Sequence, residues 1–136
     1  MFLLDTDALS ELEKPAPDAG LLAWIERVDW LDLHLSVITI GELWKGILGL
    51  PHSRKRRALE SMFDLIPDRF YNRILQIDYA IAVKFGEIQA KAGPLSSLDT
   101  LIAATALTHR LTLVTRNTRH MARTGAAILN PWSVTQ

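Results

Sequence analysis

The strongest constraint on the fold is an alternation, along the whole chain, of short apolar runs with longer segments of helical periodicity. A short apolar run is typical of a buried strand, and apolar residues three or four positions apart are typical of one helix face. Strands that alternate with helices pair in parallel, and the helices cover the sheet. The sequence therefore predicts an α/β fold with a mainly parallel central sheet of four to five strands and helices on both faces. The expected strands are residues 2–4, 33–38, 74–77, 111–115 and 127–129.

Capping and breaking residues set the expected limits of the helices. Asp18 and Asp78 stand where a side chain can cap the first turn of a helix. The pair Gly93 and Pro94 stands where a helix is expected to end. The expected helices cover residues 7–13, 18–28, 39–48, 53–66, 78–92 and, from Ser96 or Ser97, the stretch up to His109.

The composition is that of one globular domain, expected to span residues 1–136. Hydrophobic residues make up 49% of the chain and charged residues 22%, which excludes a disordered chain. Cysteine is absent, which excludes disulfides, thiolate catalysis and cysteine-bound zinc, and fits a cytoplasmic protein. No apolar run approaches the ~18 residues that span a bilayer. The first apolar run ends at Asp5 and has no basic residue before it, so we expect neither a signal peptide nor a membrane partner.

The formal net charge is zero, but the charges are unevenly distributed. Residues 1–68 contain 12 acidic and 7 basic residues, and residues 69–136 contain 3 acidic and 8 basic residues. The two halves therefore carry charges of −5 and +5. One interpretation is a polyanionic partner for the basic half. The other is that the two halves interleave in space, which would remove the asymmetry.

Polar residues follow the expected strands, where ligands of parallel sheets bind. Asp5 follows the first strand, Glu42 lies in the helix after the second, and Asp99 opens the helix before the fourth. Asn117 and His120 come after the fourth strand. Carboxylates brought together repel one another, and a divalent cation such as Mg²⁺ or Mn²⁺ removes that cost. Such a metal activates water for phosphodiester hydrolysis.

The same residues also allow a purely structural interpretation. The stretches from Thr39 to Glu42 and from Ser96 to Asp99 both match the capping box, in which an acid bonds back to the helix start. Asp5 can equally cap the turn after its strand. The two interpretations are compatible, because the helix dipole favours an acid in the first turn whether or not it also binds a metal.

Four segments resemble, in order, those of PIN domains of the VapC/FitB type. The opening is Leu-Leu-Asp-Thr-Asp-Ala-Leu-Ser-Glu-Leu at 3–12, and the second segment is Thr-Ile-Gly-Glu-Leu at 39–43. The third is Ser-Leu-Asp-Thr-Leu-Ile-Ala-Ala-Thr-Ala at 97–106. The ending is Leu-Val-Thr-Arg-Asn at 113–117, followed by Ile-Leu-Asn-Pro-Trp at 128–132.

The resemblance implies a PIN-fold ribonuclease that depends on Mg²⁺ or Mn²⁺ and acts as the toxin of a type II toxin–antitoxin pair. Such toxins form homodimers and are inhibited by an antitoxin whose C-terminal segment lies in the active-site groove. Carried over by position, Asp5 and Asp99 would bind the metal directly. Glu42 would bind it directly or through water, and Asn117 would be a polar residue of the site.

The chain departs from the family pattern at His120. After Thr-Arg-Asn the family commonly has an acid three residues further on, and here that position is histidine. Imidazole can bind Mn²⁺ but is a poor ligand for Mg²⁺. A weakened second metal site, a changed metal preference and a less active enzyme all stay open, as does a surface histidine outside the site. The alternative function is a PIN-fold module that binds RNA or protein without cutting.

Two basic groups and one other enzyme class complete the candidates. Residues 54–57 are Arg-Lys-Arg-Arg. They could bind RNA phosphates or an acidic partner, or they could form an ordinary solvated helix face. Arg116, Arg119 and Arg123 are candidates for contacts to an RNA backbone. The Asp5-Thr-Asp7 stretch is also similar to the opening of haloacid dehalogenase-like phosphatases, but Leu9 stands where their motif has threonine or valine.

Overall fold

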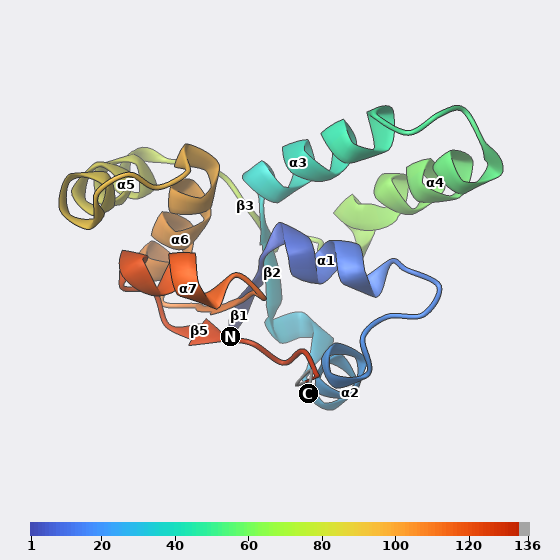
Figure 1. The fold of residues 1–136 in the computed structure, drawn as a ribbon, viewed down its shortest axis with the longest axis horizontal. Coiled ribbons are helices and arrows are strands. Elements are labelled where there is room, and N and C mark those ends of the chain that lie inside the picture. The colour runs from blue at the N-terminus through green and yellow to red at the C-terminus, as the bar shows by residue number, and fades with distance from the viewer. Residues whose placement is uncertain (134–136) are drawn as a thin grey trace.

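The structure is a computed structural model and describes residues 1–133, so the last three residues of the expected domain lie outside the described part. Its regular elements, in chain order, are β1 (Phe2–Leu4), α1 (Thr6–Leu12), α2 (Ala19–Arg27), β2 (Leu33–Ser36), α3 (Val37–Leu48), α4 (Arg54–Arg69), β3 (Ile74–Leu75), α5 (Tyr79–Ala92), α6 (Ser97–His109), β4 (Thr112–Val114), α7 (Thr118–Met121) and β5 (Ile128–Leu129). Two 3₁₀ turns, Trp30–Asp32 and Ala122–Thr124, complete them (Figure 1).

The strands form one sheet in the order β3-β2-β1-β4-β5, and every pairing is parallel. The predicted mainly parallel α/β fold is therefore confirmed. β1 is central, with Leu3 opposite His34 of β2 and Leu113 of β4. The chain moves from β1 to one side for β2 and β3 and returns to the other side for β4. The switch point of the topology, where ligands of such sheets bind, thus lies between the carboxyl ends of β1 and β4.

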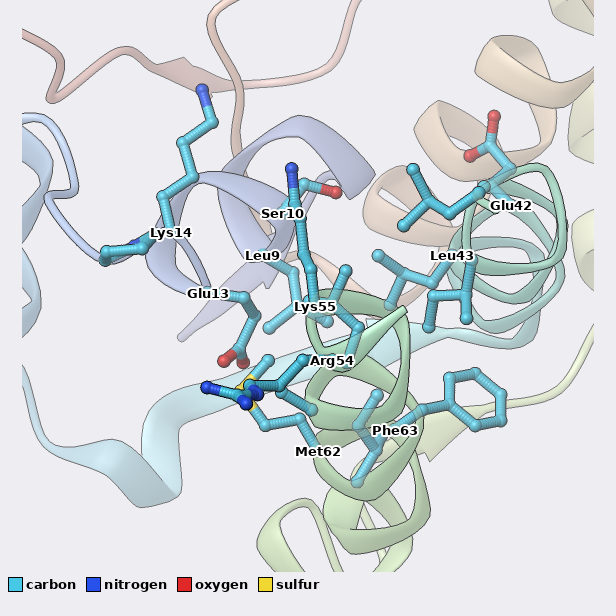
Figure 2. Close-up of a pocket in the computed structure, with 17 residues that line it drawn as sticks. Leu9, Ser10, Glu13, Lys14, Glu42, Leu43, Arg54, Lys55, Met62 and Phe63 are labelled. Carbon is cyan, nitrogen blue, oxygen red and sulfur yellow. The ribbon is translucent and has the colours of Figure 1, made fainter. Parts of the chain in front are cut away.

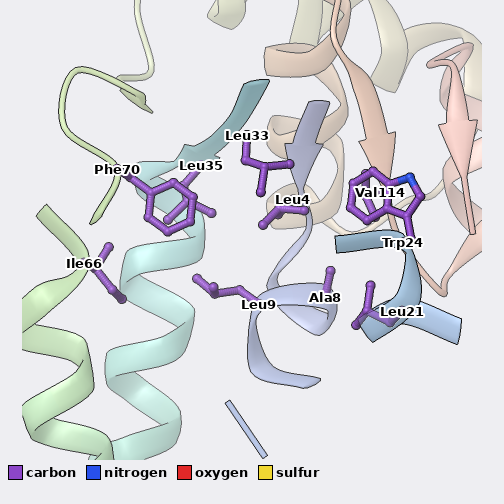
Figure 3. Close-up of a cluster of buried hydrophobic side chains, with 10 residues drawn as sticks. All are labelled: Leu4, Ala8, Leu9, Leu21, Trp24, Leu33, Leu35, Ile66, Phe70 and Val114. Atoms are coloured by element: carbon purple, nitrogen blue, oxygen red, sulfur yellow. The ribbon is translucent and has the colours of Figure 1, made fainter. Parts of the chain in front are cut away.

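Helices cover both faces of the sheet: α1 to α4 lie on one side, and α5, α6 and α7 on the other (Figure 1). Alternate strand residues point to opposite faces. Leu4 and Val114 therefore pack with α1, α2 and the end of α4 (Figure 3), whereas Leu3 and Leu113 pack with α6 and α7. Most residues of β1, β2 and β4 are buried, which holds the polar residues that follow these strands at fixed positions.

One boundary difference concerns the start of α3. We expected a strand to Ile38 and a helix from Thr39, but β2 ends at Ser36 and α3 begins at Val37. The cause is the Ser36 side chain, which accepts a hydrogen bond from the Ile38 N–H at 3.0 Å and caps the helix earlier. Asp18 and Asp78 cap their helices as predicted. Ser53 caps α4, and of the two serines left open for α6, Ser96 is the cap.

Candidate acidic active site

Asp5 is fixed at the switch point between β1 and β4. Its backbone N–H donates to the Val114 carbonyl at 2.9 Å, and its side chain caps α1 by accepting from the Thr6 N–H at 2.8 Å. Its other carboxylate oxygen, Oδ2, accepts from the Thr115 hydroxyl at 2.8 Å. Only 6% of the residue is exposed. Asp5 thus caps α1, as the structural interpretation expected. Its buried carboxylate also lies at the carboxyl end of the sheet, where a ligand is expected.

Asp7 lies in the first turn of α1 and was missing from the predicted site. Its Oδ2 accepts from the Arg116 N–H at 3.0 Å and lies 3.3 Å from the Thr115 hydroxyl. Its Oδ1 is buried and has no hydrogen-bond partner in the described part of the chain. Since Thr115 contacts the carboxylates of both Asp5 and Asp7, these two groups are close neighbours. The sequence signal for Asp7 was its spacing of two residues from Asp5, directly after a strand.

Burial and like charge together disfavour ionisation of these carboxyl groups. The pKa of Asp5 is raised to about 7, chiefly by burial and also by the charges of Asp7 and Asp99, against the lowering effect of the hydrogen bonds from Thr115 and Thr6. Burial also raises the pKa of Asp7, and the charge of Asp99 adds to this effect. Asp99 is therefore within electrostatic reach of both.

The acidic group has no basic partner in the part of the chain that the structure describes. None of the ion pairs formed within residues 1–133 includes Asp5, Asp7 or Asp99. An unpaired carboxylate in a buried place is costly, and such a cost is typical of functional sites. The group is therefore electrostatically suited to a cation.

Asp99, Asn117 and His120 line one pocket of about 500 Å³, together with Arg123. Asn117 is held by its N–H, which donates to the Thr115 hydroxyl at 3.0 Å. The exposed His120 ring lies with Nδ1 2.9 Å from Asn117 Oδ1. The structure thus brings three of the predicted site residues together, and Thr115 connects this pocket to Asp5.

Glu42 lies on the other side of Asp5. Its side chain accepts a hydrogen bond from the hydroxyl of Thr6 at 2.5 Å, and the Thr6 and Thr39 hydroxyls lie 3.0 Å apart. Because Thr6 follows Asp5 directly, Glu42 is tied to the same corner of the sheet. It does not line the pocket of Asp99, however, but a second and more apolar one.

The two predicted capping boxes have different outcomes. The box from Thr39 to Glu42 is wrong, because Thr39 is buried inside α3 and Ser36 caps that helix. In the box from Ser96 to Asp99, the Ser96 hydroxyl accepts from the Asp99 N–H at 3.4 Å. Asp99 therefore stands in the first turn of α6, where the helix dipole favours its charge.

The carboxylates are neighbours but do not form a complete set of metal ligands. Among residues 1–133, no three side chains of histidine, aspartate or glutamate are arranged to hold a metal ion. The predicted metal set of Asp5, Glu42 and Asp99, with His120 as a further ligand, therefore stays a prediction. The donor chemistry fits a hard cation: carboxylate oxygens without basic partners, one of them, Asp7 Oδ1, buried with no hydrogen bond.

An apolar groove of about 790 Å³ runs between α1, α3 and α4, and was not predicted (Figure 2). Leu9, Leu43, Met62 and Phe63 are among its lining residues, and so is Glu42, whose carboxylate accepts from the Thr6 hydroxyl. Basic side chains also line it, at Lys14, Arg54 and Lys55. The three helices come from distant parts of the sequence, and each alone has an ordinary amphipathic pattern, so the groove has no local sequence signal.

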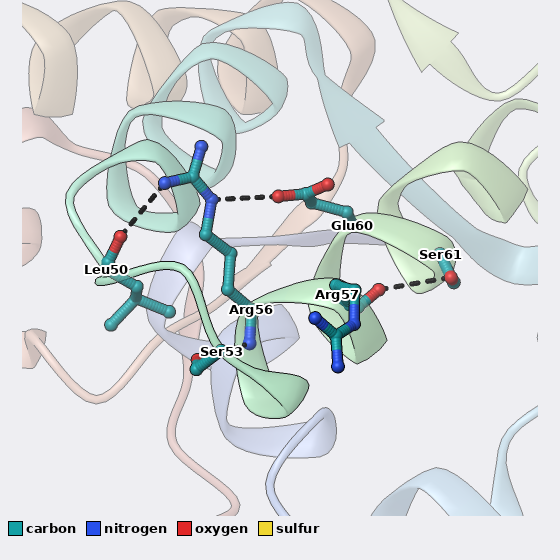
Figure 4. Close-up of polar contacts among 6 residues, drawn as sticks. All are labelled: Leu50, Ser53, Arg56, Arg57, Glu60 and Ser61. Carbon is teal, nitrogen blue, oxygen red and sulfur yellow. Dashed lines mark hydrogen bonds and ion pairs between the residues drawn. The ribbon is translucent and has the colours of Figure 1, made fainter.

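The basic run at residues 54–57 divides into structural and exposed members. Arg56 is tied into the fold: its Nε pairs with Glu60 at 2.8 Å and its Nη1 donates to the Leu50 carbonyl at 3.0 Å (Figure 4). Arg54, Lys55 and Arg57 are exposed. Of the other basic candidates, Arg116 and Arg119 have exposed side chains, and Arg123 donates to the Ala92 carbonyl at 2.6 Å.

A covered parallel sheet with carboxylates at its switch point that form no ion pair within residues 1–133 defines an α/β domain with an acidic candidate site. Comparison with known proteins identifies the family. A profile of the PIN domain matches residues 2–127, so the chain belongs to the PIN domain family.

The relatives specify the branch of that family. The chain is 35% identical to Toxin FitB of Neisseria gonorrhoeae, over 97% of this chain and 99% of that protein. It is 33% identical to VapC ribonuclease Y4jK of Sinorhizobium fredii, over 97% and 98%. The resemblance to the VapC/FitB type is thereby confirmed.

Solved structures agree with this assignment. The fold is similar to that in the crystal structure of FitAcB from Neisseria gonorrhoeae, with a TM-score of 0.91 and 34% identity over 98% of this chain and 100% of that one. A toxin–antitoxin complex from Klebsiella pneumoniae matches with a TM-score of 0.74 and 25% identity, over 98% and 100% of the two chains. Within the described residues, no helix is both long and apolar enough to cross a membrane.

Proposed function

We propose that this protein is a metal-dependent endoribonuclease, the toxin of a type II toxin–antitoxin pair. The observation that carries the proposal is the group of carboxylates of Asp5, Asp7 and Asp99 at the switch point, without basic partners in the described chain. The names of its relatives, a toxin and a ribonuclease, support the same activity.

Mg²⁺ or Mn²⁺ would be held by Asp5 and Asp99, with Glu42 binding directly or through water. When bound, such a metal supplies an activated water and neutralises charge on the phosphate. The chain's own residues prepare the site: the Thr115 hydroxyl orients Asp5, and the Thr6 hydroxyl orients Glu42. The contact of His120 with Asn117 Oδ1 leaves the Asn117 Nδ2 free to donate to a substrate oxygen.

RNA would approach over the pocket of about 500 Å³ that Asp99, Asn117 and His120 line. The exposed Arg116 and Arg119 stand on the loop and helix after β4, beside this pocket, and would contact phosphates. Contacts of this kind position the RNA without reading its sequence. An antitoxin partner is proposed because a similar fold occurs in a toxin–antitoxin complex. The homodimer and the cytoplasmic location stay predictions.

A second candidate is a PIN-fold module that binds RNA or protein without cutting. The observation that favours it is His120, which stands at the mouth of the pocket where the family commonly has an acid. This change removes one negative charge from the site.

The test is cleavage of a mixed RNA pool, including transfer RNA, by antitoxin-free protein with Mg²⁺, with Mn²⁺ and with EDTA. Asp5→Asn and Asp99→Asn are compared with the parent, and Asp64→Asn, an exposed acid of α4, is the matched control. Metal-dependent cutting that both site variants lose and the control keeps would establish the nuclease. Recovery of cutting in His120→Asp alone would mean a nuclease scaffold disabled at that position. RNA binding without cutting by any folded variant would favour the binding module.

A further inference from the structure

Asp7 has a carboxylate oxygen for which the fold provides no partner. Its Oδ2 accepts from the Arg116 N–H at 3.0 Å, but its Oδ1 is buried without a hydrogen bond in the described residues. A buried acceptor left without a donor carries its full desolvation cost, and the cost is larger when the acceptor is charged. The bond to the Arg116 N–H occupies only Oδ2, so it leaves the charged Oδ1 uncompensated. The second oxygen of Asp7 therefore calls for a ligand.

The position of Asp7 gives the nature of that ligand. The Thr115 hydroxyl contacts Oδ2 of Asp5 at 2.8 Å and Oδ2 of Asp7 at 3.3 Å, so the two carboxylates share one edge of the site. A hydroxyl has a single hydrogen, so Thr115 cannot satisfy both acids fully. None of the ion pairs within residues 1–133 includes either acid. A hard divalent cation is the partner that oxygen donors of this kind take.

The opposite side of the same loop lacks a carboxylate. Residues 115–117 follow β4, and Asp7 contacts this loop at Arg116 while His120 contacts it at Asn117. His120 is exposed and its ring nitrogen lies 2.9 Å from an amide oxygen, so it brings no negative charge to the pocket beside Asp99. The loop thus has an acid on its α1 side and none on its α7 side.

We propose that Asp7 supplies the fourth acidic group of the site, presenting Oδ1 to the metal from α1 in place of a carboxylate at position 120. This inference rests on the proposed metal-dependent function and adds a residue to it. It places two of the acids that would hold the metal at the start of α1: its capping residue Asp5, and Asp7 in its first turn. It also explains how the site keeps its negative charge with histidine at position 120.

The test is the affinity of the metal-free protein for Mn²⁺, measured by electron paramagnetic resonance or calorimetry. Asp7→Asn keeps an oxygen for the Arg116 N–H and removes the charge, so its fold is expected to persist, which circular dichroism of the variant checks. Its Mn²⁺ affinity is expected to fall at least about tenfold. Asp64→Asn, the matched exposed acid, is expected to bind like the parent. Asp7→Asn with unchanged Mn²⁺ affinity would overturn the inference.

A double variant tests whether an acid at position 120 can replace the acid at position 7. Adding His120→Asp to Asp7→Asn is expected to recover most of the lost Mn²⁺ affinity, and no recovery would overturn the exchange.

A crystal of the parent grown with Mn²⁺ gives a readout that needs no variant. An anomalous peak beside Asp7 Oδ1 supports the inference, and a peak bound by Asp5 and Asp99 but not Asp7 overturns it. If the parent bound no Mn²⁺ and cut no RNA, the proposed function would fail together with it, whereas metal binding independent of Asp7 would remove only the inference.

Discussion

The Thr115 hydroxyl donates a buried hydrogen bond of 2.8 Å to Oδ2 of Asp5, although the two residues are 110 positions apart in the sequence. Each follows a central strand, β1 for Asp5 and β4 for Thr115, and these strands are neighbours in the sheet. The bond therefore ties the first acid of the site to the loop that carries Asn117. It also favours the ionised form of Asp5 against the effect of burial.

Thr115→Val is expected to destabilise the protein, because it keeps the shape of the side chain and removes its hydroxyl. Asp5 Oδ2 and the Asn117 N–H both lose a hydrogen-bond partner. The expected loss in the free energy of unfolding is about 1–3 kcal/mol, measured by urea denaturation at neutral pH. Thr115→Ser keeps the hydroxyl and is the control. Equal stability of the valine and serine variants would show that the hydroxyl contributes little.

The metal-free protein is expected to lose stability as the pH rises towards and through 7. Asp5 has a pKa of about 7 in the folded protein, against 3.8 as the ordinary value. The folded state therefore binds a proton more tightly than the unfolded state. The stabilisation from this group is complete below about pH 4 and is lost as the pH rises through 7. The loss is of the order of a few kcal/mol, since each pKa unit corresponds to about 1.4 kcal/mol.

Urea denaturation in EDTA between pH 5 and pH 8 measures this loss. Asp5→Asn removes the titrating group, so its free energy of unfolding is expected to vary less over the same range. A parent protein that gained stability across this range would contradict the raised pKa of Asp5. Added Mn²⁺ is expected to reverse the loss in the parent, because a bound cation favours the ionised carboxylates.

The alternation of apolar runs and helical segments was enough to predict the order of the elements and the parallel sheet. That pattern is local, and buried strands such as β1 leave a clear signal in it. The start of α3 was missed because two residues, Ser36 and Thr39, have the same capping chemistry, and tertiary packing selects the first. Glu42 shows the same limit, because its partner is Thr6 from another helix rather than its own helix start.

The arrangement of the candidate site was predictable only in part, and the roles of its residues stay predictions. Asp99, Asn117 and His120 follow from strand ends and from the family segments, and the structure gathers them at one pocket. Asp7 was missed because an acid in a first turn has an ordinary role, and only the structure shows that its Oδ1 is buried and unbonded. The apolar groove depends on how three helices pack, which periodicity within each helix does not determine.

Thr6→Val is expected to weaken RNA cleavage without unfolding the protein. The Thr6 hydroxyl holds Glu42 beside Asp5, and valine leaves the Glu42 carboxylate free to rotate away. Removing a group that orients a metal-site residue costs about 10–100-fold in activity or metal affinity. The measurement is kcat/KM for an RNA substrate in Mg²⁺, with Thr6→Ser as the control that keeps the hydroxyl. A valine variant as active as the serine variant would mean that Glu42 needs no such support.

Arg56 and Arg57 are neighbours in the basic run with different expected effects on stability. Arg56 pairs with Glu60 and donates to the Leu50 carbonyl, whereas the Arg57 side chain is exposed (Figure 4). Arg56→Ala is therefore expected to lower the free energy of unfolding by about 1–2 kcal/mol, since it frees a carbonyl and a carboxylate. Arg57→Ala is expected to change it by less than about 0.5 kcal/mol. Chemical denaturation of both variants makes the comparison, and equal effects would contradict it.

Gly20→Ala is expected to destabilise the contact between α2 and the segment that follows β5. A Cβ at position 20 would lie 2.5 Å from the Pro131 carbonyl oxygen and 2.6 Å from the Ser133 nitrogen, so the backbone would have to move. That movement would break the hydrogen bond from the Gly20 N–H to the Ser133 hydroxyl, and the one from the Ser133 N–H to Asp18. The expected loss is about 1–3 kcal/mol, because over-packing forces backbone shifts of this kind.

Gly86→Ala is the matched control for this substitution. Gly86 lies inside α5, and a Cβ there would meet no atom within 4 Å. Alanine is expected to stabilise that helix by up to ~1 kcal/mol, since glycine is the poorer helix former. Thermal melting of the two variants should therefore move in opposite directions from the parent. A Gly20→Ala protein that melted at or above the parent temperature would show that residues 131–133 adjust without cost, and that this contact does not stabilise the domain.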